Sequence, residues 1–354
     1  MNNRLAKLRR GLREKSIEAI LISQPQNRRY ISGFDGTAGF LLITAQKTIL
    51  ATDFRYIEQA KKQADEFEVL QTSGKLEEWL PGLTGKLGLE KLGFEADDVS
   101  HSIYRRIRDV LAASVTGIEL VPLEGFVESL RAIKEPSEIE FIKEAAAISD
   151  AAMDYVNRTL LAGITEIEVA WKLEQFLRQN GSQGIPFDII VASGANAALP
   201  HAKPSERVIK NGEPVIIDLG ARVQGYASDI SRTICPGEAD DTFGKLYATV
   251  LKAQQTAIDG IKDGTSAVDA DNPARLVIEQ AGYGKQFGHS LGHGVGLSVH
   301  EKPYIGPVSK DELKDNMVFT IEPGVYIPDW GGIRIEDIVM LKNGKIELLS
   351  KAIK

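Results

Sequence analysis

The segment that decides the fold lies in the second half of the chain and reads Ile216-Ile-Asp-Leu-Gly-Ala-Arg-Val-Gln-Gly-Tyr-Ala-Ser-Asp-Ile-Ser-Arg232. Its two apolar ends are each interrupted by a carboxylate, Asp218 in the first and Asp229 in the second. Strand interiors disfavour Asp, and burying an unpaired carboxylate is costly. The two acids are symmetric about Val223 and Gln224. A hairpin would therefore place them opposite each other on one face, with Cβ atoms about 5 Å apart.

A second segment repeats this construction. It consists of Phe319-Thr-Ile-Glu-Pro-Gly324 and Gly332-Ile-Arg-Ile-Glu-Asp337, joined by the turn-rich Pro328-Asp-Trp-Gly-Gly332. Glu322 and Glu336 are symmetric about Asp329, so a hairpin again brings two acids together. Pro323 has no N–H to donate, and we therefore expect imperfect pairing beside Glu322.

Four buried anions require compensation, either by shared protons or by bound cations. For any one of these acids, a salt bridge or a helix cap is an equally good interpretation. Two symmetric pairs within apolar strands favour cations instead. Two divalent metals about 3.5–4 Å apart would suit four carboxylates and one imidazole.

Four of the five histidines fall in the same half of the chain as the acid pairs. His289 and His293 lie in the glycine-dense run 288–296, whose spacing fits neither a Walker loop nor a dinucleotide fingerprint. His300 follows, with a proline three residues later that excludes a helical zinc motif, and His201 lies further upstream. This grouping indicates a site without identifying which histidine is the ligand.

The patterns on either side of residue 125 differ, which predicts two domains. Residues 1–125 alternate apolar runs with helical patterns and predict an α/β domain, with residues 115–121 as its closing strand. Residues 126–134 are expected to form a linker. Residues 135–354 begin with two helices, the first running to about residue 161 and the second opened by a capping box at Thr165, and continue as a strand-rich α+β domain.

Composition limits the class of partner. The chain has 354 residues, 43% of them apolar and 26% charged, with a formal net charge of −7. This balance is typical of a globular protein, and the negative charge argues against nucleic acid as a main partner. We see neither a membrane-spanning run nor a signal peptide, and the single cysteine, Cys235, can form no intrachain disulfide. These features predict a cytoplasmic protein.

The motifs resemble those of the pita-bread metallopeptidases, which include methionine aminopeptidase, prolidase and aminopeptidase P. The resemblance spans the whole chain, and residues 1–125 resemble the creatinase/prolidase-type N-terminal domain. Arg55 and the run 32–39 look more like short bacterial aminopeptidase P-type proteins than like typical prolidases. Five positions match the family's metal ligands in order and spacing, namely Asp218, Asp229, His293, Glu322 and Glu336.

The resemblance implies two divalent metal ions per subunit. Asp218 would bind one ion, His293 and Glu322 the other, and Asp229 and Glu336 would bridge both around a shared hydroxide nucleophile. Mn²⁺ or Co²⁺ is expected, with Zn²⁺ as a further fit to a carboxylate-rich site.

The remaining catalytic roles follow from the same resemblance. Glu322 would move the proton to the leaving nitrogen, and His300 would stabilise the oxyanion. His201 would hold the substrate. His289 and Arg334 are expected to support the site or the substrate, since Arg334 lies two residues before Glu336 on the same strand face.

The resemblance implies a Xaa-Pro aminopeptidase that cuts proline-containing peptides and that forms a homodimer. The first alternative is a Xaa-Pro dipeptidase, or prolidase. A non-catalytic binding or chaperone module of the same fold and a creatinase-like C–N hydrolase are further alternatives, which the complete ligand set disfavours.

Overall fold

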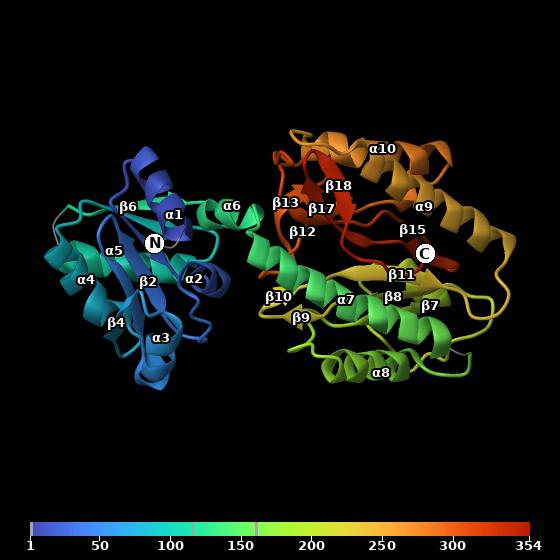
Figure 1. The fold of residues 1–354 in the computed structure, drawn as a ribbon, viewed down its shortest axis with the longest axis horizontal. Helices are drawn as coiled ribbons and strands as arrows, with labels where there is room; N and C mark the ends of the chain where they lie inside the picture. The colour runs from blue at the N-terminus through green and yellow to red at the C-terminus, as the bar shows by residue number, and fades with distance from the viewer. Residues whose placement is uncertain (1–2, 115–116, 160–161) are drawn as a thin grey trace. The chain divides into compact units, whose positions relative to one another are not determined.

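The computed structural model describes residues 3–114, 117–159 and 162–354. The chain divides into two compact units, residues 1–131 and 132–354 (Figure 1). Residues 126–134, expected as a linker, contain the helix α6 (Phe126–Ala132). None of the helices within the described ranges combines the length and the apolar content needed to cross a membrane.

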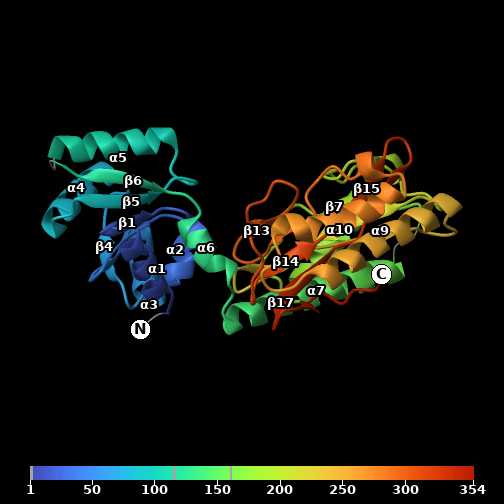
Figure 2. The ribbon, with the colours of Figure 1, turned by 90° about the horizontal axis from the view of Figure 1, so that it is seen from above.

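The first unit is built on a six-stranded mixed sheet with the order β4-β3-β2-β1-β5-β6. Apolar side chains of α4 and α5 pack on one face of this sheet, and α1 lies on the opposite side (Figure 2). The basic N-terminal segment forms an amphipathic helix whose three leucines are buried. The elements are α1 (Asn3–Glu14), β1 (Ala19–Ile22), α2 (Pro25–Ser32), β2 (Phe40–Thr44), β3 (Thr48–Thr52), η1 (Phe54–Tyr56), α3 (Ile57–Gln63), β4 (Glu68–Gln71), α4 (Leu76–Leu87), β5 (Lys91–Glu95), α5 (His101–Ser114) and β6 (Glu119–Leu123).

The start of the predicted closing strand, residues 115–116, lies outside the described residues, and the strand itself is β6. The sequence patterns missed β5, which lies between β1 and the edge strand β6 of this sheet. Gly93 interrupts its short apolar run, and a Cβ there would come within 2.7 Å of a Leu123 methyl group. Close packing between neighbouring strands therefore explains the glycine that hid the strand.

The second unit contains two larger sheets, each backed by a pair of helices, and two two-stranded sheets, β10-β9 and β15-β16. The sheet β11-β8-β7 shares a core with α7 (Pro136–Thr159) and α8 (Glu166–Gln179). The sheet β13-β12-β14-β17-β18 shares a core with α9 (Asp241–Gly260) and α10 (Ala267–Gln280), on the other side of the unit (Figure 1). The strands are β7 (Ile190–Ser193), β8 (Val215–Leu219), β9 (Arg222–Val223), β10 (Tyr226–Ala227), β11 (Ile230–Ile234), β12 (Gly292–Gly294), β13 (Glu301–Ile305), β14 (Val318–Ile321), β15 (Gly324–Ile327), β16 (Gly331–Arg334), β17 (Asp337–Lys342) and β18 (Lys345–Leu348).

Local signals in the sequence set several boundaries of this unit. The Thr165 side chain caps α8 and forms the expected capping box with Glu168. Asn343 and Gly344 connect β17 to β18 with φ angles of 51° and 73°, the left-handed geometry of a tight hairpin turn. The predicted end of the α7 helix at residues 160–161 lies outside the described residues.

The first acid hairpin forms, but its register differs from the predicted one. Asp218 lies opposite Ser231 rather than Asp229. The turn is centred on Gln224 and Gly225, whose φ angles of 46° and 78° both lie in the left-handed region. Moving the centre by one residue moves the cross-strand partner by two, so Asp229 stays on the same face as a diagonal neighbour of Asp218.

The second acid hairpin has the predicted register. Ile321 pairs with Asp337 on one side of the acids and Gly324 pairs with Arg334 on the other. Glu322 and Glu336 therefore face each other in the gap between these strand pairs, next to Pro323 as expected. Asp329, at the centre of symmetry, has a φ of 65° and turns the chain.

Candidate metal centre and active site

All nine predicted site residues line one cavity of about 460 Å³ in the second unit. Both of the larger sheets of the unit contribute acids or imidazoles to the cavity. Asp218 lies on β8 and Asp229 just before β11, while His293 lies on β12 of the other sheet. The remaining members are Glu322, Glu336, His201, His289, His300 and Arg334.

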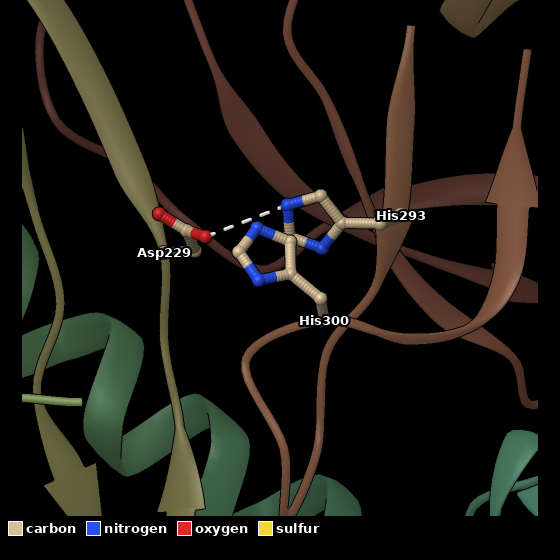
Figure 3. A group of neighbouring side chains, drawn as sticks. All are labelled: Asp229, His293 and His300. Atoms are coloured by element: carbon tan, nitrogen blue, oxygen red, sulfur yellow. Dashed lines mark ion pairs between the residues drawn. The ribbon is translucent and has the colours of Figure 1, made fainter. Parts of the chain in front are cut away.

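The proposed ligand atoms converge at the centre of this cavity. His293 Nε2 lies 3.3 Å from Glu322 Oε1 and 3.6 Å from Asp229 Oδ2. Figure 3 shows the ion pair between Asp229 and the imidazole of His293, with the ring of His300 next to that of His293. Potential ligand atoms lie within 4.8 Å of one another in three overlapping groups, which are Asp229–His293–His300, His293–Glu322–Glu336 and Asp218–Asp229–Glu336.

The crowding of the acids changes their proton affinities. Burial, reinforced by the neighbouring carboxylates, raises the pKa of Asp229 and of Glu336 well above the ordinary range. Burial opposes ionisation of Glu322, but the hydrogen bond and the charge interaction with His293, together with the charges of His289 and Arg334, outweigh it and lower the pKa of Glu322 to about 2. The protein without cations therefore holds some of these acids as protonated groups.

The donor set fits a pair of divalent cations. Asp218 Oδ1 is buried and has no hydrogen-bond partner among the described residues. A buried carboxylate oxygen without a donor is costly, and a cation removes that cost. Four carboxylates and one imidazole also match the oxygen-rich ligand preference of Mn²⁺ and related ions.

Arg334 ties the two acid hairpins together. Its Nη2 donates to Asp218 Oδ2 at 2.7 Å, and its Nε donates to Ser231 Oγ at 2.8 Å. Ser231 Oγ in turn donates to Glu336 Oε2 at 2.7 Å. This guanidinium is buried and contacts Asp218 directly and Glu336 through the Ser231 hydroxyl.

The other histidines lie on the wall of the cavity. His300 is close to the centre, since its ring centroid lies 4.1 Å from that of His293, and burial lowers its pKa. His289 Nε2 lies 3.0 Å from Tyr326 Oη, which also accepts a hydrogen bond from Arg334 Nη1. His289 is therefore linked to the acids through Tyr326 and Arg334.

Glu166 is a supporting residue that the sequence did not reveal. It is fully buried, and its two oxygens accept hydrogen bonds from the backbone and hydroxyl groups of Ser193 and Ser205 and from the amide of Asn196. The segment between these partners includes His201. The sequence showed Glu166 only as the first residue of α8, where an acid is ordinary, so no local signal marked it.

Comparisons with known proteins agree with this geometry. Residues 140–343 match the model of Metallopeptidase family M24, and residues 4–133 match that of the Creatinase/Prolidase N-terminal domain. The chain is 37% identical to a Xaa-Pro dipeptidase from Pyrococcus horikoshii, with 98% of this chain and 97% of the relative covered.

Solved structures of Xaa-Pro peptidases are similar to this chain over its whole length. A Xaa-Pro dipeptidase from Bacillus anthracis superposes with a TM-score of 0.94 at 42% identity, with 99% of this chain and 98% of that chain covered. An X-Pro aminopeptidase from Thermotoga maritima superposes with a TM-score of 0.89 at 37% identity, with 98% and 97% covered. The fold expected from the family resemblance is thus confirmed, and the chain belongs to Metallopeptidase family M24 with a Creatinase/Prolidase N-terminal domain.

Proposed function

We propose that this protein is a metal-dependent Xaa-Pro dipeptidase. The observation that carries the proposal is the convergence of Asp218, Asp229, His293, Glu322 and Glu336, with Asp218 Oδ1 buried and without a donor among the described residues. The dipeptidase names of two close relatives favour this substrate over the longer peptides of our main expectation, the aminopeptidase P-type activity.

Two divalent ions would be held by the ligand set expected from the sequence, with Asp229 and Glu336 shared between them. When bound, such ions neutralise the acids, polarise the scissile carbonyl and activate a water molecule as the nucleophile. We propose that both ions are Mn²⁺ or both are Co²⁺, with Zn²⁺ as the alternative.

The side chains around the ions supply the proton transfers. Glu322 Oε1 contacts His293 Nε2 and accepts a hydrogen bond from Thr320 Oγ1 at 3.0 Å. These described contacts fall on one oxygen and leave Oε2 to carry a proton to the proline nitrogen, which must be protonated to leave. Burial lowers the pKa of His300, so its ring is neutral near pH 7 and can donate one N–H to the developing oxyanion.

The free carboxylate of a dipeptide needs a cation in the cavity. Arg334 is already engaged by Asp218, Ser231 and Tyr326. Lys203 also lines the cavity and is exposed. We therefore assign recognition of the proline carboxylate to Lys203, while the apolar wall, which includes Phe187 and Ile190, accommodates the proline ring.

The test compares one Xaa-Pro dipeptide, its amide and a Xaa-Pro-Xaa tripeptide. The chelated protein is assayed after adding back Mn²⁺, Co²⁺ or Zn²⁺ separately. We expect the dipeptide to give the highest kcat/KM. A clear preference for the tripeptide would instead assign the aminopeptidase activity, and no hydrolysis with any metal would refute both.

Replacing Lys203 sharpens the assignment. In Lys203→Met we expect the KM for the dipeptide to rise about fivefold to tenfold, because a charge-assisted contact is lost at an exposed site. The KM for the amide, which has no carboxylate, should stay unchanged. Lys210→Met, at an exposed lysine that does not line the cavity, is the matched control.

The homodimer and the cytoplasmic location stay predictions. Light scattering coupled to size-exclusion chromatography measures the first, and fractionation of the producing cells followed by an activity assay measures the second.

A further inference from the structure

A buried ion pair involves Glu301, the residue that follows His300 of the cavity lining. Lys134 Nζ is 3.1 Å from Glu301 Oε1, and the two side chains are 1% and 4% exposed. Within the described residues, Lys134 Nζ makes no hydrogen bond, so the Glu301 carboxylate is its charge partner. Such pairs are expensive to desolvate, and apolar residues of similar volume often serve stability equally well. Stability is therefore a poor explanation for this pair.

Its position relative to His300 suggests another explanation. Glu301 opens β13 and follows His300 directly in the chain. His300 lies in the bend that leads into this strand, so the two neighbouring residues share one peptide unit. His300 lies beside His293 in the cavity (Figure 3), while Glu301 is buried against Lys134. The orientation of one side chain is therefore coupled to that of the other.

Both ends of the pair are held by the surrounding backbone. Lys134 N donates to Asn316 O at 2.9 Å, and Ile133 forms an isolated bridge with Met317 at the start of β14. Glu301 Oε2 accepts a hydrogen bond from Ser298 N at 3.2 Å. Lys134 is thus fixed to the sheet that carries His293 and Glu322, and it provides a rigid reference point for the His300 segment.

Gly296 shows how closely the chain fits around this carboxylate. A Cβ at position 296 would lie only 2.3 Å from Glu301 Oε1. The loop from His293 to His300 therefore needs glycine at this point to pass over the buried acid. The loop, the acid and the lysine form one packed arrangement behind the two histidines.

We propose that Lys134 and Glu301 are positioning residues, whose buried ion pair holds the His300 ring at the reacting centre. The proposal rests on the proposed function only in giving His300 its role toward the oxyanion. A displacement of about 1 Å at a reacting group can cost about 100-fold in rate. Loss of the pair should therefore lower kcat, while substrate binding changes little.

The test is a double-mutant cycle on the metal-loaded enzyme. We expect Lys134→Met to lower kcat about 10- to 100-fold with little change in KM. In a His300→Ala background the same substitution should change kcat less than about twofold, because the group it positions is gone. If Lys134→Met lowers kcat by the same factor in the wild type and in the His300→Ala background, the proposal is overturned.

A second readout does not depend on substrate. In Zn²⁺-loaded protein with labelled histidines, Lys134→Met should shift the ring signals of His300 and leave those of His101 unchanged. Metal content should equal that of the wild type. An unmoved His300 signal, or loss of metal, would overturn the positioning role even if the dipeptidase activity is real. If the wild type cleaves no Xaa-Pro peptide, the ring signals still decide the positioning role.

Two further variants guard against a folding defect. The neutral pair Lys134→Met with Glu301→Gln removes both buried charges, so it should melt near the wild-type temperature yet keep the low kcat. Recovery of wild-type kcat in this variant would refute the need for the ion pair. Lys314→Met is the matched control, since Lys314 lies 3.5 Å from Glu312 with both side chains 57% exposed, and its kcat should equal that of the wild type.

Discussion

Two buried acidic regions of the second unit have opposite surroundings. Glu166 is fully buried, and each of its oxygens accepts hydrogen bonds from three donors on Ser193, Asn196 and Ser205. In the acid cluster of Asp218, Asp229, Glu322 and Glu336, the carboxylates face one another, and Asp218 Oδ1 has no donor among the described residues.

The number of hydrogen-bond donors around a buried carboxylate distinguishes a structural role from a role in binding cations. Fixed protein donors compensate the charge of Glu166 and hold the segment that includes His201. The acid cluster has too few donors, and burial with mutual repulsion raises the pKa of Asp229 and Glu336. Burial of an acid is thus ambiguous by itself, and the count of donors around it decides its role.

The largest effect is expected from breaking the acid cluster. Asp229→Asn or Glu336→Gln should lower kcat/KM about 1,000-fold or more, since each removes a ligand shared by both proposed ions. Metal content measured by mass spectrometry should fall as well. Near-normal turnover and metal content in either purified variant would contradict the ligand assignment.

Removal of the metal tests the same region without mutation. Chelation should abolish activity and lower the melting temperature, because an ion at 1,000 times its Kd stabilises the fold by about 4 kcal/mol. Calorimetry of the chelated and reloaded protein measures the shift. Asp229→Asn should show a much smaller shift. An equal shift in wild type and variant would place the responsible ion elsewhere.

Glu95 in the first unit is intermediate between Glu166, which has many hydrogen-bond donors, and the acid cluster, which has few. It accepts hydrogen bonds from Ser23, Gln24 and Asn27, yet burial, aided by the nearby Glu128, raises its pKa to about 7. Because the folded pKa is raised, its contribution to stability is complete below the ordinary value of 4.5 and is lost as the pH rises through about 7.

We therefore expect the free energy of unfolding to fall by about 3 kcal/mol between pH 5 and pH 8 relative to Glu95→Gln. Denaturant titrations of wild type and variant at several pH values measure this difference. Parallel pH profiles of the two proteins would show that Glu95 titrates in the same range whether folded or unfolded.

The smallest effect is expected at Glu166. Glu166→Gln keeps the size of the side chain but replaces an oxygen acceptor by an amide facing fixed donors, which should destabilise the protein by about 2 kcal/mol. Metal content should stay unchanged, in contrast to Asp229→Asn. Glu174→Gln, at a half-buried glutamate of α8 that pairs with the exposed Arg178, is the control and should alter stability by less than about 0.5 kcal/mol. Loss of metal in Glu166→Gln would remove the distinction between the two regions.

Patterns that act over short distances were predictable. The capping box at Thr165, the turn at Asn343 and Gly344 and the register of the second acid hairpin all follow from neighbouring residues. The turn of the first hairpin was predicted one residue away from its actual centre, so the predicted register is wrong by two residues. Its turn is set by two left-handed residues, Gln224 and Gly225, and only the glycine is a strong signal for that geometry.

The sequence by itself marked the two acid pairs and the group of histidines as candidates for a cation site, because carboxylates inside apolar strands are costly unless they are compensated. Only the tertiary structure decided how those residues are supported. Glu166 contacts partners up to 39 residues away in the sequence. Lys134 and Glu301 are separated in the sequence by more than half the length of the second unit. Pairings over such separations depend on how the two sheets pack, and no local pattern of residues encodes that packing.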